Sequence, residues 1–297
     1  MKRIILFIGF ILFISLSSCE KEEVFNSENS IRDDAGNIFP LDFNPKRIIS
    51  LAPNITETIY SLNADSLLFG VTDYCDFPPE AKNKDKVGSL LDPNIEKITS
   101  LKPDLIFMTT EGNSKYTYLS LKNNGFKVFV ANPGDIDGIK RMITGIGILT
   151  GKKQTAKKLA ERIEDERKYF KLENTGIKPK KCLLIVSMNP LITVNRFTYI
   201  SEVMELSGLE NIYNSELLEY PNISYEDVLL KNPECIVYMC DTTNKTLVME
   251  TADAIKSRLG VTDAVKNNRI FPVDENIISR PGTRVMECVK LLRLKVF

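Results

Sequence analysis

A short helix, a Pro-acidic turn and a buried strand follow one another in Glu96-Lys97-Ile98-Thr99-Ser100-Leu101-Lys102-Pro103-Asp104-Leu105-Ile106. The same order returns in the second half of the chain, in Glu226-Asp227-Val228 … Asn232-Pro233-Glu234-Cys235-Ile236. A Pro-Asn-Ile tripeptide precedes each copy, at 93–95 and at 221–223, with a register that differs by two residues. The match therefore indicates a duplicated plan, and we expect two similar lobes.

On both sides of these copies, short apolar runs alternate with amphipathic stretches along the chain. The runs lie at 47–51, 105–108, 128–130, 182–186, 236–239 and 270–273. Continuous apolar runs of this length are typical of strands that are buried on both faces of a parallel sheet. Their alternation with helical patterns such as residues 56–62 predicts an α/β fold, with three layers and a mostly parallel sheet in each lobe.

One long helix is predicted between the lobes, over about residues 151–172. Its apolar positions recur at helical spacing, and Lys157/Glu161 and Glu164/Lys168 stand at i,i+4 on the outside. A helix of about 21 residues would span about 32 Å, which is enough to reach from one lobe to the other. We therefore expect an N-terminal lobe at 30–135, a helical connection at 136–177 and a C-terminal lobe at 178–297.

The N-terminus has the features of a secretory signal. A basic Met1-Lys2-Arg3 precedes an apolar run from Ile4 to Leu16, which is too short to span a bilayer. The ending Leu16-Ser17-Ser18-Cys19 resembles the bacterial lipobox, which implies that residues 1–18 are removed and that Cys19 carries the lipid anchor. A simple signal with an incidental cysteine is the alternative.

Residues 19–29 are too polar to bury anything and are predicted to form a solvated tether. Within this tether, Lys21-Glu22-Glu23 resembles a surface-export tag of some Gram-negative lipoproteins, although any tether can be charged.

Composition excludes several classes of function. Lys+Arg and Asp+Glu both number 39, and this zero net charge argues against a nucleic-acid partner. His is 0, which removes histidine-based catalytic triads, zinc sites and haem ligation. No nucleophile elbow or phosphate loop is present, so we expect no catalytic residues, no metal site and no cofactor.

Five cysteines remain after Cys19, and none has CxxC spacing. An odd number cannot all pair, and most are expected to be buried as small apolar side chains; the pattern leaves open whether any form disulfides. They are Cys75, Cys182, Cys235, Cys240 and Cys288.

Four motifs resemble the cobalamin- and iron-siderophore-binding proteins of ABC importers, the substrate-binding proteins with a helical backbone. The motifs are Arg47-Ile48-Ile49-Ser50-Leu51-Ala52-Pro53-Asn54-Ile55-Thr56-Glu57, Tyr74-Cys75-Asp76-Phe77-Pro78-Pro79-Glu80-Ala81, Leu101-Lys102-Pro103-Asp104-Leu105-Ile106 and Arg280-Pro281-Gly282-Thr283-Arg284. The resemblance covers about 30–297 and is strongest to the vitamin B12-binding branch, through the Tyr-x-x-x-Pro-Pro and Pro-Asn-Ile-Ser-x-Glu segments.

The resemblance implies a non-enzymatic, monomeric protein of the periplasm that holds cobalamin or a related corrinoid in a cleft between its lobes. It would deliver this ligand to a dimeric ABC permease with its ATPase subunits. Two alternatives remain: a ferric-siderophore-binding protein of such an importer, and a lipoprotein that captures corrinoid at the cell surface.

Site residues follow from the resemblance position by position. Glu96 and Glu226 match the two glutamates that dock onto permease arginines, although each could instead merely favour the positive end of its own helix. The positions expected to contact ligand are Asn54, Tyr74, Tyr220, Asn276 and Arg280.

One departure concerns the corrin stack, because Leu90 stands where the cobalamin binders often have a Trp. For an anionic iron chelate, Arg280 and Arg284 would be the counter-charges.

Overall fold

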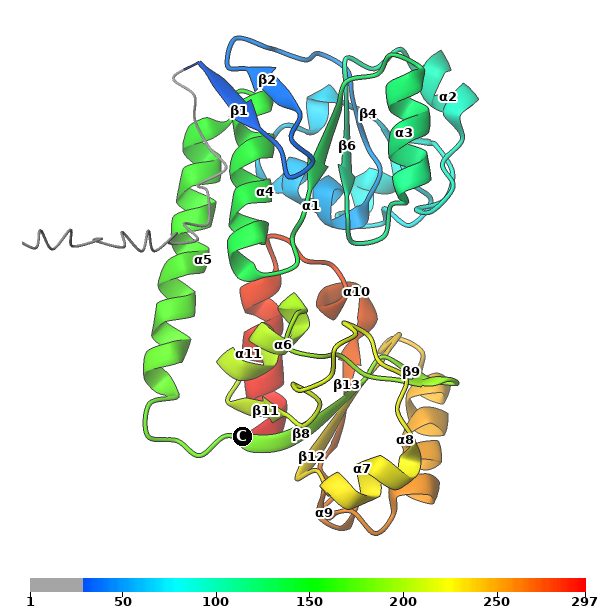
Figure 1. The fold of residues 1–297 in the computed structure, drawn as a ribbon, viewed down its shortest axis with the longest axis vertical. Helices are drawn as coiled ribbons and strands as arrows, with labels where there is room; N and C mark the ends of the chain where they lie inside the picture. Colours follow the sequence, from blue (N-terminus) through cyan, green and yellow to red (C-terminus); the bar gives the residue numbers. More distant parts are fainter. Residues whose placement is uncertain (1–28) are drawn as a thin grey trace, which may run out of the picture.

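Two α/β lobes stand one above the other in the computed structural model, which describes residues 29–297 (Figure 1). The predicted signal peptide, Cys19 and nearly all of the tether lie outside the described residues. The N-terminal lobe contains a five-stranded, fully parallel sheet in the order β5-β4-β3-β6-β7. Its strands are β3 (Ile48–Ser50), β4 (Leu68–Val71), β5 (Asp85–Lys86), β6 (Leu105–Thr109) and β7 (Val128–Ala131).

Helices cover both faces of this sheet and complete the three layers. On one face, α1 (Pro53–Ser61) and α4 (Ile136–Leu149) pack against apolar side chains such as Phe107 and Phe129. On the other face lie α2 (Ile95–Ser100) and α3 (Lys115–Asn123). Short 3-10 turns at Asp65–Leu67 and Pro79–Asn83 and an antiparallel hairpin of β1 (Ser30–Arg32) and β2 (Ile38–Pro40) complete the lobe.

The C-terminal lobe repeats this plan with a four-stranded parallel sheet in the order β11-β8-β12-β13. One face is covered by α6 (Tyr199–Leu206) and α11 (Val285–Val296), and the other by α7 (Tyr225–Lys231), α8 (Lys245–Leu259) and α9 (Asp263–Lys266). The remaining elements are β8 (Lys180–Ile185), β9 (Ser187–Met188), β10 (Leu191–Ile192), β11 (Leu209–Asn211), β12 (Cys235–Cys240), β13 (Ile270–Asp274) and α10 (Glu275–Ile278).

The duplicated segments have the same local structure. In each, a short capped helix is followed by a residue with left-handed φ, then a Pro, then a strand. The left-handed residue is Lys102 (φ 47°) before β6 and Asn232 (φ 42°) before β12. The acidic residue after the Pro also has the same role, because Asp104 accepts from the backbone N–H of Arg47 and Glu234 from that of Lys181. The correspondence seen in the sequence is therefore structural.

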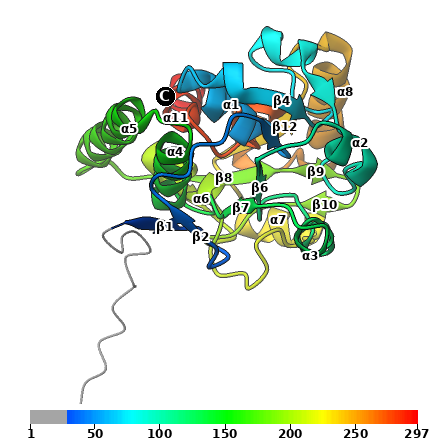
Figure 2. The same ribbon diagram turned by 90° about the horizontal axis from the view of Figure 1, so that it is seen from above.

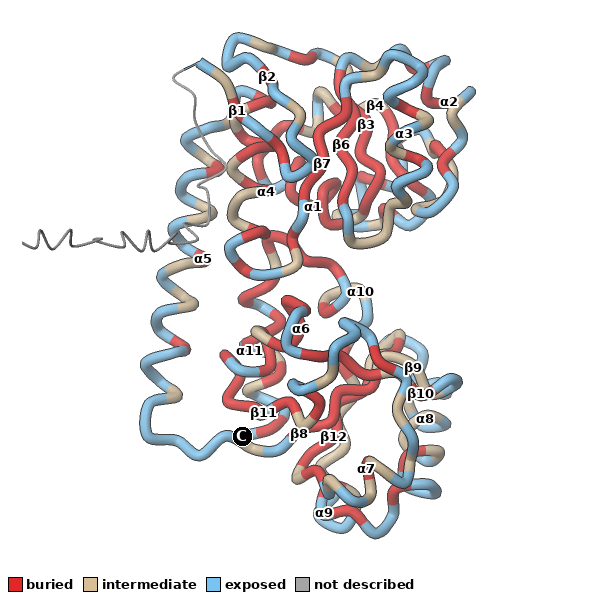
Figure 3. Tube along the Cα trace, in the orientation of Figure 1, coloured by how far each residue is buried: buried red, intermediate tan, exposed pale blue. Residues whose placement is uncertain are grey.

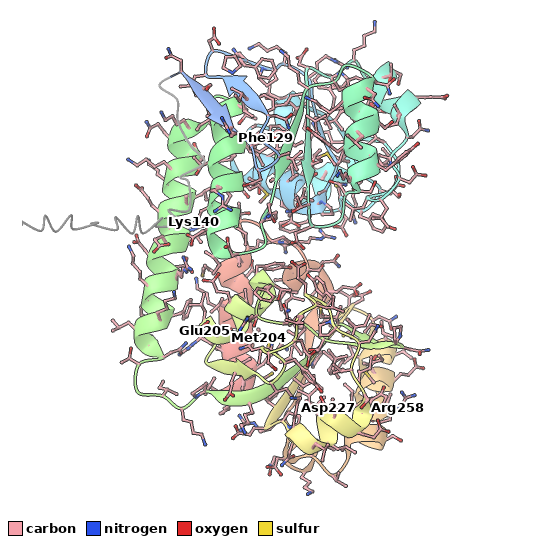
Figure 4. The ribbon with its side chains drawn as sticks, in the orientation of Figure 1. Phe129, Lys140, Met204, Glu205, Asp227 and Arg258 are labelled. Carbon is pink, nitrogen blue, oxygen red and sulfur yellow. The ribbon has the colours of Figure 1, made fainter. Side chains whose placement is uncertain are left out.

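The helix predicted over about 151–172 is α5 (Lys153–Glu173), and it lies beside both lobes (Figures 1 and 2). Its first half packs on α4, where Lys140 extends toward α5 and pairs with Glu164 at 2.6 Å (Figure 4). Its second half contacts the C-terminal lobe through a salt bridge: Arg167 Nη2 lies 2.5 Å from Oε1 of Glu202, which belongs to α6. It begins two residues later than expected because Gly151 adopts a left-handed φ of 72° and ends the preceding helix.

Buried side chains form one continuous core that passes through both lobes beneath α4, α5, α6 and α11. A second core lies between the N-terminal sheet and α2 and α3, and a third between the C-terminal sheet and α7 and α8 (Figure 3). Between residues 29 and 297, no helix is both long enough and apolar enough to cross a membrane.

Candidate ligand-binding site

Loops that leave the carboxyl ends of both parallel sheets meet between the lobes. Asn54, after β3, contacts Pro281, after β13, and Asp76, after β4, contacts Arg280. Carboxyl ends of parallel strands are the usual place for a ligand crevice in α/β folds. The expected ligand positions of both lobes therefore come from loops that face the inter-lobe region.

Arg280 joins three of the predicted positions into one group. Its Nη2 donates to Asn276 Oδ1 at 2.5 Å and to the carbonyl oxygen of Tyr74 at 3.4 Å. The Tyr74 side chain itself is 59 % exposed, whereas Arg280 is only 9 % exposed. Tyr74 is thus available to a ligand, while the guanidinium of Arg280 lies behind it.

Arg280 belongs to an ion-pair cluster that the sequence did not reveal. Its Nη1 donates to Glu57 Oε1 at 3.0 Å and to Asp76 Oδ1 at 2.7 Å, and Arg284 binds Glu57 with two bonds of 2.7 and 2.8 Å. Burial alone would lower the pKa of Arg280, but the hydrogen bonds to Asp76 and Glu57 outweigh it and raise the pKa. Both guanidiniums are already paired with carboxylates of the protein.

Asn54 is 3 % exposed and is used within the protein. Its Nδ2 donates to the carbonyl oxygen of Pro281 at 3.1 Å, which fixes the Arg280–Arg284 segment against the start of α1. The Asn54 amide is therefore buried and paired between the lobes, and its contact with ligand stays a prediction.

Tyr220 lies on the C-terminal lobe beside two carboxylates. It is 39 % exposed, and partial burial together with Glu111 and Glu219 raises the pKa of its hydroxyl. Burial and the charge of Glu219 likewise raise the pKa of Glu111, which follows β6 on the opposite lobe. The Tyr220 edge of the inter-lobe region is therefore acidic.

A hollow of about 610 Å³ opens next to this acidic edge, on the side of α5. Both lobes line it, with Glu111 and Asn132 from one and Arg196, Phe197 and Glu219 from the other. Glu205, which faces the hollow from α6, is labelled in Figure 4. None of the five predicted contact residues lines the hollow itself, although Tyr220 is the sequence neighbour of Glu219.

Leu90 packs over the carboxyl end of β6. A Cβ added at Gly112 would lie 2.5 Å from Leu90 Cδ2, and Asn113 donates to the Leu90 carbonyl at 2.7 Å. Leu90, at the position where the resemblance implied a ring, is thus held against the loop that follows β6.

Glu96 and Glu226 occupy equivalent, exposed places on the two lobes. Each is the second residue of its helix, α2 or α7, and each helix is capped by the side chain before it, Asn94 or Ser224. Figure 1 shows α2 in the upper part of the N-terminal lobe and α7 in the lower part of the C-terminal lobe, both away from the region between the lobes. The two glutamates are therefore separate from the inter-lobe site.

Within residues 29–297, no group of three or more acidic or cysteine side chains is arranged to hold a metal ion. The five cysteines within residues 29–297 are buried and form no disulfide.

Comparison with known proteins agrees with this architecture. The sequence profile of the periplasmic binding protein family matches residues 48–277. The vitamin B12-binding protein of Vibrio cholerae serotype O1 is 28% identical over 248 residues, which are 84% of this chain and 88% of that protein.

Two solved structures are similar in fold and in sequence. The periplasmic vitamin B12-binding protein BtuF of Vibrio cholerae aligns with a TM-score of 0.75 at 27% identity, covering 86% of this chain and 97% of that one. A possible iron-binding periplasmic solute-binding protein of Staphylococcus epidermidis aligns with a TM-score of 0.72 at 27% identity, covering 86% and 99%. With both lobes and the connecting helix matched, this chain belongs to the periplasmic binding protein family.

Proposed function

We propose that this chain is the substrate-binding lipoprotein of an ABC importer, and that it captures cobalamin or a related corrinoid and delivers it to the permease. The observation that carries the proposal is the similarity to vitamin B12-binding proteins, which extends over 84% of the chain in sequence and 86% in structure. No catalytic step is part of this role.

The chemistry of the inter-lobe region supports an uncharged, amide-fringed macrocycle. Tyr74 and Tyr220 offer exposed rings with a polar end, one from each lobe, and such rings suit both the faces and the amide edge of a corrin. Asn276 and Tyr74 are both bonded to Arg280, and because the Asn276 Oδ1 accepts that bond, its Nδ2 group is left to donate to the amide edge.

Charge argues against an anionic chelate. Arg280 and Arg284, the expected counter-charges, are neutralised by Glu57 and Asp76. The carboxylates of Glu111 and Glu219 near Tyr220 would repel an anion. The iron-chelate reading remains the second candidate because the Staphylococcus epidermidis neighbour, named as possibly iron-binding, is as similar in sequence as the vitamin B12-binding one.

Delivery to the permease is proposed to use Glu96 and Glu226. A two-lobed protein that meets a two-fold partner needs one charged contact on each lobe at equivalent places, and these glutamates satisfy that condition. The lipid on Cys19 would keep the protein at a membrane surface of the periplasm, whereas a surface-capture role would place it outside the cell. Protease treatment of intact cells separates the two, because a periplasmic protein survives it.

The direct test is a titration of the chain from Glu20 onward, which keeps every described residue. Cyanocobalamin, cobinamide and a panel of ferric siderophores are compared by calorimetry. One-to-one corrinoid binding that Tyr74→Ala weakens supports the proposal. Binding of an iron chelate without corrinoid binding would preserve the transport role and overturn the ligand.

A further inference from the structure

Glu57 is a buried carboxylate that holds the two lobes together without facing solvent. It lies in α1 of the N-terminal lobe and is 2 % exposed. Both of its oxygens are used, by Arg284 in a bidentate pair and by Arg280 in a single bond. The two arginines come from the segment between α10 and α11, so the cluster joins the lobes at a place separate from α5.

The outward partners of the same arginines are the predicted ligand residues. Arg280 donates to the backbone of Tyr74 and to the side chain of Asn276, and Arg284 donates to the backbone carbonyl of Asn276 at 3.2 Å. Arg284 also stacks over the ring of Phe77 at 4.2 Å. Glu57 therefore orients the guanidiniums that hold Tyr74 on one lobe and Asn276 on the other.

The carboxylate of Glu57 supplies half of the negative charge in this cluster. Two guanidiniums face two carboxylates, and the second carboxylate, Asp76, is half exposed and contacts Arg280 alone. Without the Glu57 charge, Arg284 would lose both of its carboxylate bonds and would remain largely buried. An unpaired buried charge is costly, so the segment would move toward solvent.

We propose that Glu57 is a positioning residue for ligand binding, which acts through Arg280 and Arg284 to hold Tyr74 and Asn276 of opposite lobes in a preformed ligand surface. The identity of the ligand in this inference rests on the proposed function, whereas the geometry of the cluster does not. Groups behind a binding surface govern affinity in this way because they fix the side chains that touch the ligand. Glu57 itself touches no ligand.

The test compares Glu57→Gln with Glu164→Gln in the chain from Glu20 onward. Glu164 is a matched control, because it also serves several cations, Lys140 at 2.6 Å and Arg167 at 3.7 Å, but lies on α5 away from Tyr74 and Asn276. Cyanocobalamin affinity is measured by calorimetry at a temperature where circular dichroism shows both variants folded. Glu57→Gln should weaken binding by roughly tenfold or more, and Glu164→Gln by less than about threefold.

Two further readouts distinguish positioning from simple destabilisation. The induced circular dichroism of saturating cyanocobalamin reports how the corrin sits against the protein, and it should change in Glu57→Gln only. Arg284→Lys, which keeps the charge but loses the bidentate fork, should act in the same direction and replaces Glu57→Gln if that variant does not fold. Unchanged affinity and an unchanged spectrum would overturn the proposal.

Hydrogen exchange of the ligand-free protein keeps the proposal independent of the ligand. Amides of residues 74–77 and 276–284 should exchange faster in Glu57→Gln and at the wild-type rate in Glu164→Gln. If wild-type protein binds no corrinoid, the proposed function fails and this exchange pattern still decides the role of Glu57. Equal exchange in the three proteins would refute it.

Discussion

Gly147 on α4 allows α5 to lie directly against it, and replacing it provides a quantitative test of this joint. A Cβ added at Gly147 would stand 2.2 Å from the Cβ of Ala156. Ordinary contact begins at 3.4 Å, so Gly147→Ala requires the helices to part by about 1 Å. Neither group can rotate away, because each Cβ is fixed to a helical backbone.

The expected energy combines two opposing effects. Crowding of this kind costs about 1–3 kcal/mol, whereas Ala in place of a helical Gly gains about 1 kcal/mol. Gly147→Ala should therefore destabilise the protein by about 1–2 kcal/mol. Ala156→Gly should cost about 1 kcal/mol through helix propensity, and more through the loss of a buried methyl group.

The double exchange separates crowding from propensity. With Gly147→Ala and Ala156→Gly together, the methyl group moves to the other helix, the two propensity effects cancel, and the contacts left at the new Cβ are 3.3 Å or more. We expect stability near that of the wild type, which corresponds to a coupling energy of about 2 kcal/mol.

Urea unfolding followed by far-ultraviolet circular dichroism measures all four proteins. Ala160→Gly in place of Ala156→Gly is the control, because it weakens the same helix one turn further on and should add to Gly147→Ala without relief. If the double exchange is destabilised by the sum of its single changes, the close approach of α4 and α5 is wrong.

Three further outcomes are expected. Glu96→Lys with Glu226→Lys should abolish cobalamin-dependent growth and leave affinity unchanged, since both side chains are exposed and distant from the inter-lobe loops; persistent growth would contradict the docking role. Burial and Glu219 raise the pKa of Glu111 above 4.5 in the native state. Protonation of Glu111 therefore stabilises the native state below pH 4.5, and this stabilisation is lost as pH rises through the native pKa. Glu111→Gln should therefore be more stable than wild type at pH 7, with the gap in urea midpoint closing toward pH 4.5; a constant gap would contradict this. Ellman's reagent should find the five described thiols unreactive in the native protein, because all are buried and burial raises the pKa of Cys288 to about 12. After unfolding, all five thiols should react; a lower number of reactive thiols would reveal a disulfide.

Sequence alone predicted the elements whose burial is uniform. Every apolar run taken for a strand coincides with an observed one, such as 105–108 with β6 and 236–239 with β12, because a strand covered on both faces needs apolar residues at each position. The strands β4, β5 and β11 were not predicted. β5 and β11 are short and contain charged residues, Asp85 and Lys86 or the exposed Glu210, so no apolar run marks them. β4 does lie in an apolar stretch, which Gly70 interrupts.

The ligand positions illustrate a different limit. Motif resemblance named Tyr74, Asn276 and Arg280, which the structure joins through the Arg280 guanidinium, and their contact with ligand stays a prediction. Resemblance could not indicate that polar atoms of Asn54 and Arg280 are already bonded within the protein. Glu57 was part of a quoted motif and was not singled out. Its partners lie more than two hundred residues away, and no local spacing can indicate such a pair.

Because α5 on one flank and the Glu57 cluster elsewhere both tie the lobes, ligand capture requires no large closing movement. Association should then proceed without a slow conformational step, and the observed rate should rise linearly with ligand concentration. A binding surface that does not wrap its ligand also leaves part of it in solvent. Groups that project outward from the macrocycle, such as alternative lower bases or upper axial substituents, should therefore be tolerated, which gives a cell one carrier for many members of a ligand class.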